Sequence, residues 1–225
     1  MNPEDFRKVF DSVKVVPDPE EEAREKRKEE TDFRAKLHIC GIEKRFADCT
    51  FEKIEGNGIP KEIQKHYEQV KEYAEHFDEY FSKGIGVMFM GGVGRMKTTM
   101  AVAIAQHVLK RGKSAYFISM AELLDKMISM SKNTDRSELQ RFENTISQTN
   151  LLILDDLGME YPSDWVLNKV DAIITSRYNK MLPIVITTNL IPAEINTRYM
   201  ERIYDRLKST SISIIETGRS LRRLA

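Results

Sequence analysis

The fold of this chain is decided by the stretch GVMFMGGVGRMKTT, residues 86–99. It begins with an apolar run, residues 86–91, of the length and composition of a buried strand. A glycine-rich segment follows, and KTTMAVAIAQHVLKRG, residues 97–112, has the pattern of a helix closed by Gly112. A glycine-rich loop between a strand and a helix is the setting that a phosphate-binding loop requires. The stretch therefore predicts the first strand, loop and helix of a nucleotide-binding fold.

From Arg45 onward, apolar runs alternate with helical patterns, as a parallel sheet with crossover helices requires. Further strands are predicted at residues 114–120, 151–156, 183–189 and 211–216. Helices are predicted at residues 121–130, around 139–146, at 164–180 and at 193–209. Together with the strand at 86–91, these elements predict an α/β fold, a doubly wound five-stranded parallel sheet flanked by helices.

The glycine-rich loop has the residues needed to bind a nucleotide. Small residues let backbone N–H groups curl around phosphate oxygens, and the following helix adds the positive end of its dipole. Lys97 is expected to bridge the β- and γ-phosphates, and Thr98 to place its hydroxyl on Mg²⁺. The predicted ligands are thus ATP and Mg²⁺, and the predicted binding residues are Gly91, Gly92, Val93, Gly94, Arg95, Met96, Lys97, Thr98 and Thr99.

Met96 departs from the usual loop pattern, which has glycine immediately before the lysine. If the backbone there needs a conformation that only glycine adopts freely, methionine costs on the order of 1–3 kcal/mol and weakens nucleotide binding. Alternatively, the side chain points outward and leaves the N–H groups in place. We expect a working loop, because Lys97, Thr98 and the downstream elements are all present.

Polar residues follow two of the predicted strands. In LLILDD, Asp155 is the expected Mg²⁺ carboxylate. Asp156 is expected to polarise the attacking water, although this role more often falls to the longer glutamate, so hydrolysis is expected to be slow. PIVITTN ends in Asn189 and is expected beside the strand that carries Asp155. Asn189 is expected to orient the water or to contact the γ-phosphate.

Two arginines near the C-terminal end are further candidates. In MERIYDRL, Arg202 and Arg206 lie one helical turn apart; they either form an exposed basic helix, or one of them reaches the ATP of a neighbouring subunit. Arg222 follows the last strand and either contacts the γ-phosphate of its own subunit or belongs to a basic tail. Residues 176–225 contain nine Lys or Arg against four Asp or Glu, a surplus of 9 − 4 = 5. This local surplus predicts salt-sensitive binding of single-stranded DNA without sequence preference.

Overall composition limits other functions. The chain has 225 residues, 41% of them hydrophobic, and 35 basic residues balance 35 acidic ones. This balance gives no global field toward nucleic acid or membrane. Cys40 and Cys49 are too far apart for a CxxC pair and are expected to be reduced thiols. No apolar run has the length of a membrane span, and MNPEDFRKVF lacks the order of a signal peptide, so a cytoplasmic protein without a membrane partner is expected.

Residues 1–40 are predicted to form a charged, partly helical extension, and residues 41–225 the ATPase domain. The run PDPEEEAREKRKEETDF, residues 17–33, is almost entirely charged and is typical of a solvated helix or a tail. Four apolar residues ahead of this run have helical spacing and form a candidate surface for docking a partner: Phe6, Val9, Phe10 and Val13.

The ordered set GGVGRMKTT, LLILDDLG, ITTN, MERIYDRL and GRSLR resembles the bacterial DnaC/DnaI helicase loaders and the related IstB transposition helper ATPases. The likeness spans roughly residues 41–223. It implies an AAA+ ATPase that self-associates through ATP interfaces, binds single-stranded DNA and grips a replicative helicase with its N-terminal region. The chain departs from the family at Met96 and in lacking a cysteine-rich zinc module near its N-terminus. The implied roles are Walker B pair for Asp155 and Asp156, sensor 1 for Asn189, arginine finger for Arg202 and sensor 2 for Arg222.

The resemblance favours an ATP-dependent helicase loader acting in the initiation of DNA replication. An IstB-like transposition helper is the alternative from the same ATPase class. A DNA-binding adaptor whose ATPase has decayed is the third possibility, suggested by Met96 and Asp156.

Overall fold

Strand β1 (Gly86–Gly91) lies inside a five-stranded sheet whose order is β2-β3-β4-β1-β5. The computed structural model describes residues 19–132, 134–161 and 163–221. All neighbouring strands pair in parallel, and β3 lies between β2 and β4. The doubly wound parallel sheet predicted from the sequence is therefore confirmed. The other strands are β2 (Ala115–Ser119), β3 (Leu151–Leu157), β4 (Ile184–Thr188) and β5 (Ser211–Glu216).

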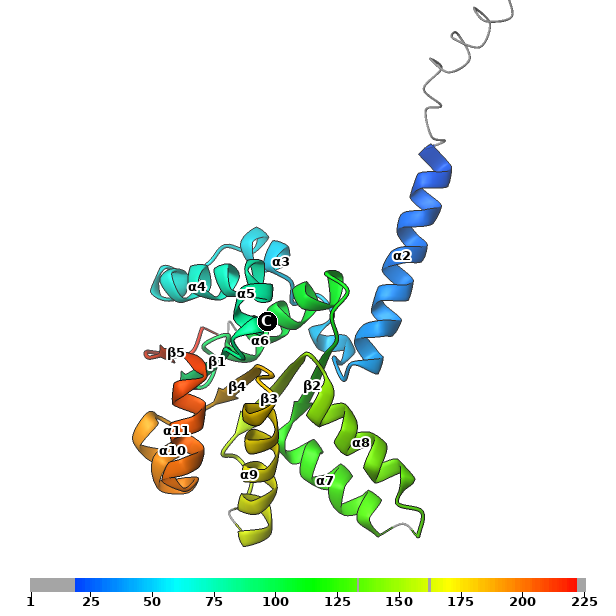
Figure 1. Ribbon diagram of the computed structural model, residues 1–225. Helices are drawn as coiled ribbons and strands as arrows, with labels where there is room; N and C mark the ends of the chain where they lie inside the picture. The colour runs from blue at the N-terminus through cyan, green and yellow to red at the C-terminus, as the bar shows by residue number, and fades with distance from the viewer. Residues whose placement is uncertain (1–18, 133, 162, 222–225) are drawn as a thin grey trace, which may run out of the picture. The chain divides into compact units, whose positions relative to one another are not determined.

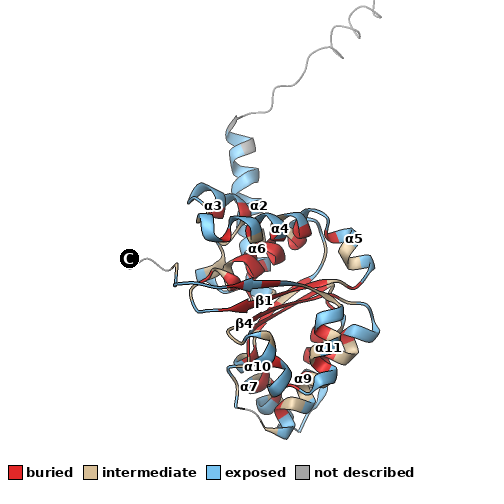
Figure 2. Cartoon of the chain, turned by 90° about the vertical axis from the view of Figure 1, so that its left-hand side faces the viewer, coloured by how far each residue is buried: buried red, intermediate tan, exposed pale blue. Residues whose placement is uncertain are grey.

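Helices cover both faces of the sheet (Figures 1 and 2). One face carries α3 (Phe51–Gly56), α4 (Gln64–Glu75), α5 (Phe77–Ser82) and α6 (Lys97–Lys110). The opposite face carries α7 (Met120–Ser131), α8 (Ser137–Gln148), α9 (Asp164–Asn179), α10 (Pro192–Arg198) and α11 (Glu201–Ser209). Alternate strand residues, such as Met88 and Leu154, enter the core on this second face. No helix in the described part of the chain is long and apolar enough to span a membrane.

Helix α6 packs against the sheet and is almost wholly buried, because it is apolar on nearly all sides. The amide of Gln106, in this helix, lies 3.1–3.2 Å from the carbonyl oxygens of Phe46, Ala47 and Cys49. Buried polar groups need such partners, so Gln106 fixes the short 3₁₀ turn Lys44–Phe46 and the residues after it against α6. This contact places Arg45 and Phe46 beside the phosphate loop.

Arg177, on α9, is a fully buried guanidinium that bonds to two parts of the chain, the segment from the end of α8 to β3 and the residue before β4. It donates to main-chain carbonyls at distances of 2.8–3.0 Å. Burial lowers the pKa of Arg177 to about 9, which leaves it charged at neutral pH. The carbonyls belong to Ile146, Thr149 and Pro183.

Three features differ from the sequence-based expectation. The helix predicted at 193–209 is broken at Tyr199 and Met200, because the chain leaves the helical path to bury the Tyr199 ring and bring its hydroxyl to Glu160. Helices α3, α4 and α5 were not predicted as elements, although Tyr67, Val70 and Tyr73–Ala74 have helical spacing and are buried. The sequence favours core positions for the aromatic residues Phe117, Trp165 and Tyr178; Phe117 is buried, but Trp165 and Tyr178 are 40% and 44% exposed.

Contacts within the chain divide it into two compact units, Met1–Lys36 and Leu37–Ala225. The described part of the first unit belongs to helix α2 (Pro19–Ile39), where charged side chains are exposed and pairs such as Arg34 with Glu30 lie one turn apart. The expected solvated helix is present there. The domain boundary expected at residue 40 lies close to the division and remains a prediction. The candidate docking surface at Phe6, Val9, Phe10 and Val13 lies outside the described residues.

Candidate nucleotide site

A cavity of about 360 Å³ opens at the carboxyl edge of the sheet, where ligands of open α/β sheets bind. It is lined by three segments that the sequence singled out: the loop from Val93 to Thr99, the acidic end of β3 and Asn189 after β4. Gly91 and Gly92 lead into the loop from β1 but do not line the cavity. The complete lining is Arg45, Phe46, Val93, Gly94, Arg95, Met96, Lys97, Thr98, Thr99, Asp155, Asp156, Asn189 and Leu221.

Two glycines of the loop are required by close approach as well as by backbone conformation. Gly91 has φ +116°, and a Cβ there would lie 2.0 Å from the carbonyl oxygen of Glu216. Gly94 has φ +76°, and a Cβ there would lie 2.0 Å from Oγ of Ser220. Any larger residue would force the loop away from the end of β5 or from the segment that follows it. These glycines therefore set the path that the loop takes around the cavity.

Met96 has left-handed backbone angles, φ 62° and ψ 12°, at the N-cap of α6. Glycine adopts this conformation freely. Of the two possibilities raised by the sequence, the backbone therefore has the conformation that favours glycine. The side chain is half-buried at the cavity wall, and the backbone N–H of Met100 still bonds to the Met96 carbonyl at 2.9 Å. The helix thus begins normally despite the methionine.

Lys97 is buried, and its ammonium group is held by three oxygen atoms. Nζ donates to the carbonyls of Gly91 and Gly92 at 2.8 and 2.7 Å, and to Oδ1 of Asn189 at 2.8 Å. An ammonium group has three donors, so a phosphate oxygen approaching Nζ must replace at least one of these acceptors. Two of these acceptors are main-chain carbonyls and the third is the side chain of Asn189, so the side chain can be displaced without moving the loop.

Asp155 is buried and accepts hydrogen bonds from two threonines at the same oxygen. The hydroxyls of Thr98 and Thr187 lie 2.9 and 2.5 Å from its Oδ1. Burial raises the pKa of Asp155, and the neighbouring charge of Asp156 adds to this effect. A carboxylate beside a hydroxyl at a phosphate loop fits Mg²⁺, which takes one or two protein oxygens and completes its shell with phosphate and water. The described residues contain no cluster of three or more His, Cys, Asp or Glu that would hold a metal alone.

Asp156 differs from Asp155 in exposure and in backbone conformation. Its side chain is exposed at the cavity, and its φ of 54° is left-handed. The backbone N–H of Asp156 donates to Oγ1 of Thr187 at 3.0 Å, which anchors this unusual geometry to β4. The two adjacent acids therefore face different surroundings, one buried among hydroxyls and one open to solvent.

Of the two arginine candidates, the structure describes Arg202, and this residue does not line the cavity. Arg202 lies on α11, and its Nη2 is 2.6 Å from Oδ2 of Asp171 on α9. Arg206, one turn later, contacts Oδ1 of the same carboxylate at 3.2 Å. Arg222 lies outside the described residues.

Sequence reasoning missed three residues that line the cavity: Arg45, Phe46 and Leu221. The guanidinium carbon of Arg45 lies 4.8 Å from the centre of the Phe46 ring, and this ring lies 5.8 Å from that of Phe117. They form an aromatic and cationic wall beside the phosphate loop. No periodicity in the sequence marks this wall, because only the Gln106 contacts bring it to the site.

Comparison with known proteins agrees with this geometry. The sequence profile of the family described as IstB-like ATP binding protein matches residues 6–222. The replicative helicase loader DnaC of Escherichia coli (strain K12) is 29% identical over 170 residues, which cover 75% of this chain and 66% of that protein. The replicative helicase loader DnaI of Bacillus subtilis (strain 168) is 26% identical over 135 residues, 59% of this chain and 42% of the relative. A crystal structure of the DnaC helicase loader has 25% sequence identity and a TM-score of 0.67, over 78% of this chain and 100% of that one.

The match to DnaC thus spans just under two thirds of that relative, and the match to DnaI less than half. The predicted resemblance is confirmed by the family profile, by both relatives and by the structural likeness. Since the profile extends over nearly the whole sequence and the phosphate loop occupies its expected place in the parallel sheet, the chain belongs to the family of IstB-like ATP-binding proteins, with the P-loop fold of the AAA+ class.

Proposed function

We propose that this chain is an ATP-dependent loader of a replicative helicase that acts in the initiation of DNA replication. The observation that supports it best is the cavity where the phosphate loop, the Thr98–Asp155 pair and Asn189 meet. The similarity to relatives named replicative helicase loaders supports a role in loading a helicase.

The residues of the cavity suggest how ATP would bind. Backbone N–H groups of the loop and the N-terminus of α6 would receive the phosphates. Lys97 would leave Asn189 to contact the β- and γ-phosphates, and Asn189 would then be available to the γ-phosphate or to a water. Arg45 and Phe46 would pack against the base. Mg²⁺ held by Thr98 and Asp155 would neutralise charge on the phosphates.

Hydrolysis is assigned to residues that face this cavity. Asp156 is exposed there and would orient and polarise the attacking water, with Asn189 as its partner. An aspartate reaches less far than a glutamate, so we expect slow turnover. Arg202 would act on the ATP of a neighbouring subunit, exchanging its bond to Asp171 for the phosphates across the interface. Catalysis would then depend on self-association.

Single-stranded DNA and the helicase are the proposed macromolecular partners. The local basic surplus of residues 176–225 supports contact with a DNA backbone. The helicase would be gripped by residues 1–40, as the resemblance to helicase loaders implies. A transposition helper is the second candidate, favoured by the description of the matching family. An adaptor with a decayed ATPase is the third, and the intact contacts of Lys97, Thr98 and Asp155 weigh against it.

The test combines nucleotide binding with capture of the partner. Calorimetry with ATP and Mg²⁺ should give a binding isotherm for the wild type and none for Lys97→Ala. Lys113→Ala removes a surface lysine paired with Asp78 and should bind ATP as the wild type does. The replicative helicase of the source organism should be retained on the immobilised protein when ATP is present. Binding of ATP without any retention of helicase, together with retention of a transposase, would replace the loader with the transposition helper.

Measuring ATP turnover distinguishes the adaptor with a decayed ATPase from the two candidates that hydrolyse ATP. We expect slow turnover that single-stranded DNA changes and that Lys97→Ala abolishes. Binding without any turnover, at any protein concentration and with DNA present, would identify the decayed adaptor instead.

A further inference from the structure

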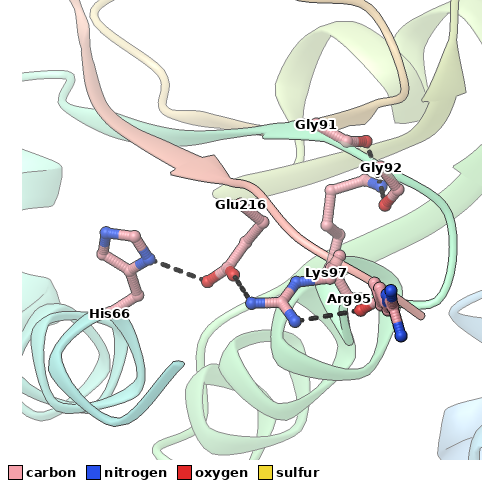
Figure 3. Close-up of polar contacts among 7 residues, drawn as sticks. His66, Gly91, Gly92, Arg95, Lys97 and Glu216 are labelled. Atoms are coloured by element: carbon pink, nitrogen blue, oxygen red, sulfur yellow. Dashed lines mark hydrogen bonds and ion pairs between the residues drawn. The ribbon is translucent and has the colours of Figure 1, made fainter. Parts of the chain in front are cut away.

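Arg95 is part of the phosphate loop, yet its guanidinium bonds to residues at the end of β5 and just after it (Figure 3). The side chain is 3% exposed. Its Nη2 lies 3.1 Å from Oε2 of Glu216, and its Nη1 donates to the carbonyl oxygen of Arg219 at 3.1 Å. The only other basic side chain of the loop is Lys97, whose Nζ bonds to loop carbonyls and Asn189 at the cavity. The two cations of the loop therefore have different neighbours.

Glu216 is the last residue of β5 and is itself buried, with 1% of its side chain exposed. Its second carboxylate oxygen, Oε1, lies 2.8 Å from Nδ1 of His66 on α4 (Figure 3). The carboxylate thus joins three separate parts of the fold: the end of β5, helix α4 and the phosphate loop. A buried carboxylate requires such compensation, because an unpaired charge in this position is strongly destabilising.

The segment 216–221 supports the loop at two further points. The backbone N–H of Gly92 donates to the carbonyl of Glu216 at 3.2 Å, and the N–H of Leu221 donates to the carbonyl of Gly94 at 2.9 Å. Gly94 also lies against Ser220 so closely that a Cβ would clash. The loop is therefore attached to the end of β5 by its main chain on both sides of Val93 and by the side chain of Arg95.

From these contacts we infer that Arg95 and Glu216 are positioning residues that hold the phosphate loop in its nucleotide-binding shape before a nucleotide arrives. This inference rests on the proposed function of the cavity. Met96, directly after Arg95, is held in a left-handed conformation that a methionine disfavours. The buried pair fixes the residue before it and keeps the loop from relaxing. A loop that is already ordered does not lose conformational freedom on binding, which strengthens affinity for the ligand.

The ion pair also determines which positive charges of the loop face the phosphates. Because Glu216 neutralises Arg95, positive charge from the loop reaches the phosphates through Lys97 and through the backbone N–H groups. Arg95 is thus a positioning residue, and its effect on nucleotide binding should appear only through the geometry of the loop.

The experiment compares three variants with a matched control. Glu216→Gln keeps the shape of the side chain but removes its charge, Arg95→Met removes the guanidinium, and the double variant removes both. Each single variant should weaken binding of ATP with Mg²⁺ by about tenfold, the factor that corresponds to about 1.4 kcal/mol. The double variant should bind no more weakly than the worse single one, because the two residues act as one unit. Glu55→Gln is the control, since it breaks an exposed pair between Glu55 on α3 and Lys71 on α4 and should leave affinity unchanged.

A second measurement follows the loop itself and needs no nucleotide. Hydrogen exchange of the amides of Gly92 and Leu221, detected by NMR in the nucleotide-free protein, should accelerate about tenfold or more in Glu216→Gln. Amides of β3 should exchange at the wild-type rate, whereas a general loss of stability would accelerate both groups alike. His66→Gln, which removes only the outer partner of Glu216, is a milder variant and should show the same local effect to a smaller degree.

The two measurements fail in distinguishable ways. If the wild type binds no ATP, the proposed function is lost, and exchange at Gly92 and Leu221 still decides whether the pair orders the loop. If the variants bind ATP like the wild type and these two amides remain protected, the positioning role is overturned while ATP binding stands. If exchange accelerates equally in β3 and in the loop, the pair is a general stabiliser of the fold and the inference is also overturned.

Discussion

Replacing Met96 by glycine tests whether the free-energy cost of its left-handed backbone belongs to folding or to ATP binding. A non-glycine residue in this conformation costs roughly 1–2 kcal/mol, and glycine adopts it freely. Met96 is left-handed in a loop that the Arg95–Glu216 pair and main-chain contacts to residues 216–221 hold in place. The cost therefore belongs to folding, and it should be absent from the free energy of ATP binding. We expect Met96→Gly to change the dissociation constant for ATP by less than about threefold, or about 0.65 kcal/mol.

The effect of the same change on folding is a balance of larger contributions. Glycine relieves roughly 1–2 kcal/mol of backbone strain but loses about 0.5–1 kcal/mol through the greater freedom of the unfolded chain. The half-buried methionine side chain also contributes to stability, at about half of the roughly 1.5–3 kcal/mol of a fully buried one. These terms nearly cancel, so we expect urea unfolding to show a change within about 1 kcal/mol.

Met96→Ala is the matched control, because it removes the side chain but keeps the Cβ that disfavours the left-handed region. It should bind ATP like Met96→Gly and should unfold more easily than Met96→Gly by about 1 kcal/mol. Calorimetry measures the affinities and urea denaturation the stabilities. If Met96→Gly tightens ATP binding by about 5–30-fold, the factor for 1–2 kcal/mol, while Met96→Ala does not, the methionine enters its conformation only on binding and the reasoning is refuted.

Three further predictions follow from the structure. Arg177→Met removes the guanidinium that bonds to three buried carbonyls and should lower the free energy of unfolding by about 3–5 kcal/mol in urea. The neighbouring exposed Lys180→Met should change it by no more than about 0.5 kcal/mol. Burial lowers the pKa of His107 below its ordinary value of 6.5, so its contribution to stability is present above about pH 6.5 and is lost as the pH falls through the folded-state pKa. Thermal melts from about pH 7.5 to 5 should show a declining midpoint that His107→Gln makes less steep, and equal slopes would contradict the assignment. Arg202→Ala should still bind ATP but lose turnover. Mixing it with Lys97→Ala should restore part of the turnover, because one interface then combines an intact lysine with an intact arginine. No recovery would argue against action between subunits.

Much of the site followed from the sequence because the strand ends of a parallel sheet share one edge. An apolar strand before the glycine-rich loop and another before Asp155 were enough to predict that these residues meet. The pairing of β3 with β4, with Leu154 opposite Ile186, then brings Asn189 to the same edge. Each of these inferences used only local periodicity and a general rule of topology. The positions of these residues agree with the structure, whereas the roles of Asp156 and Asn189 in hydrolysis stay predictions.

The tertiary structure alone decided which side chains face which neighbours. The ion pair of Arg95 with Glu216 joins residues 121 positions apart, and no local pattern distinguishes this arginine from a phosphate ligand. The cavity wall at Arg45 and Phe46 depends on a glutamine of α6, and the bond of Arg202 to Asp171 depends on the packing of α11 on α9. Spacing along a chain determines helices, strands and their exposed or buried faces, because these depend on near neighbours. The partner of a buried charge depends on which distant segments fold beside it, so only the assembled fold determines it.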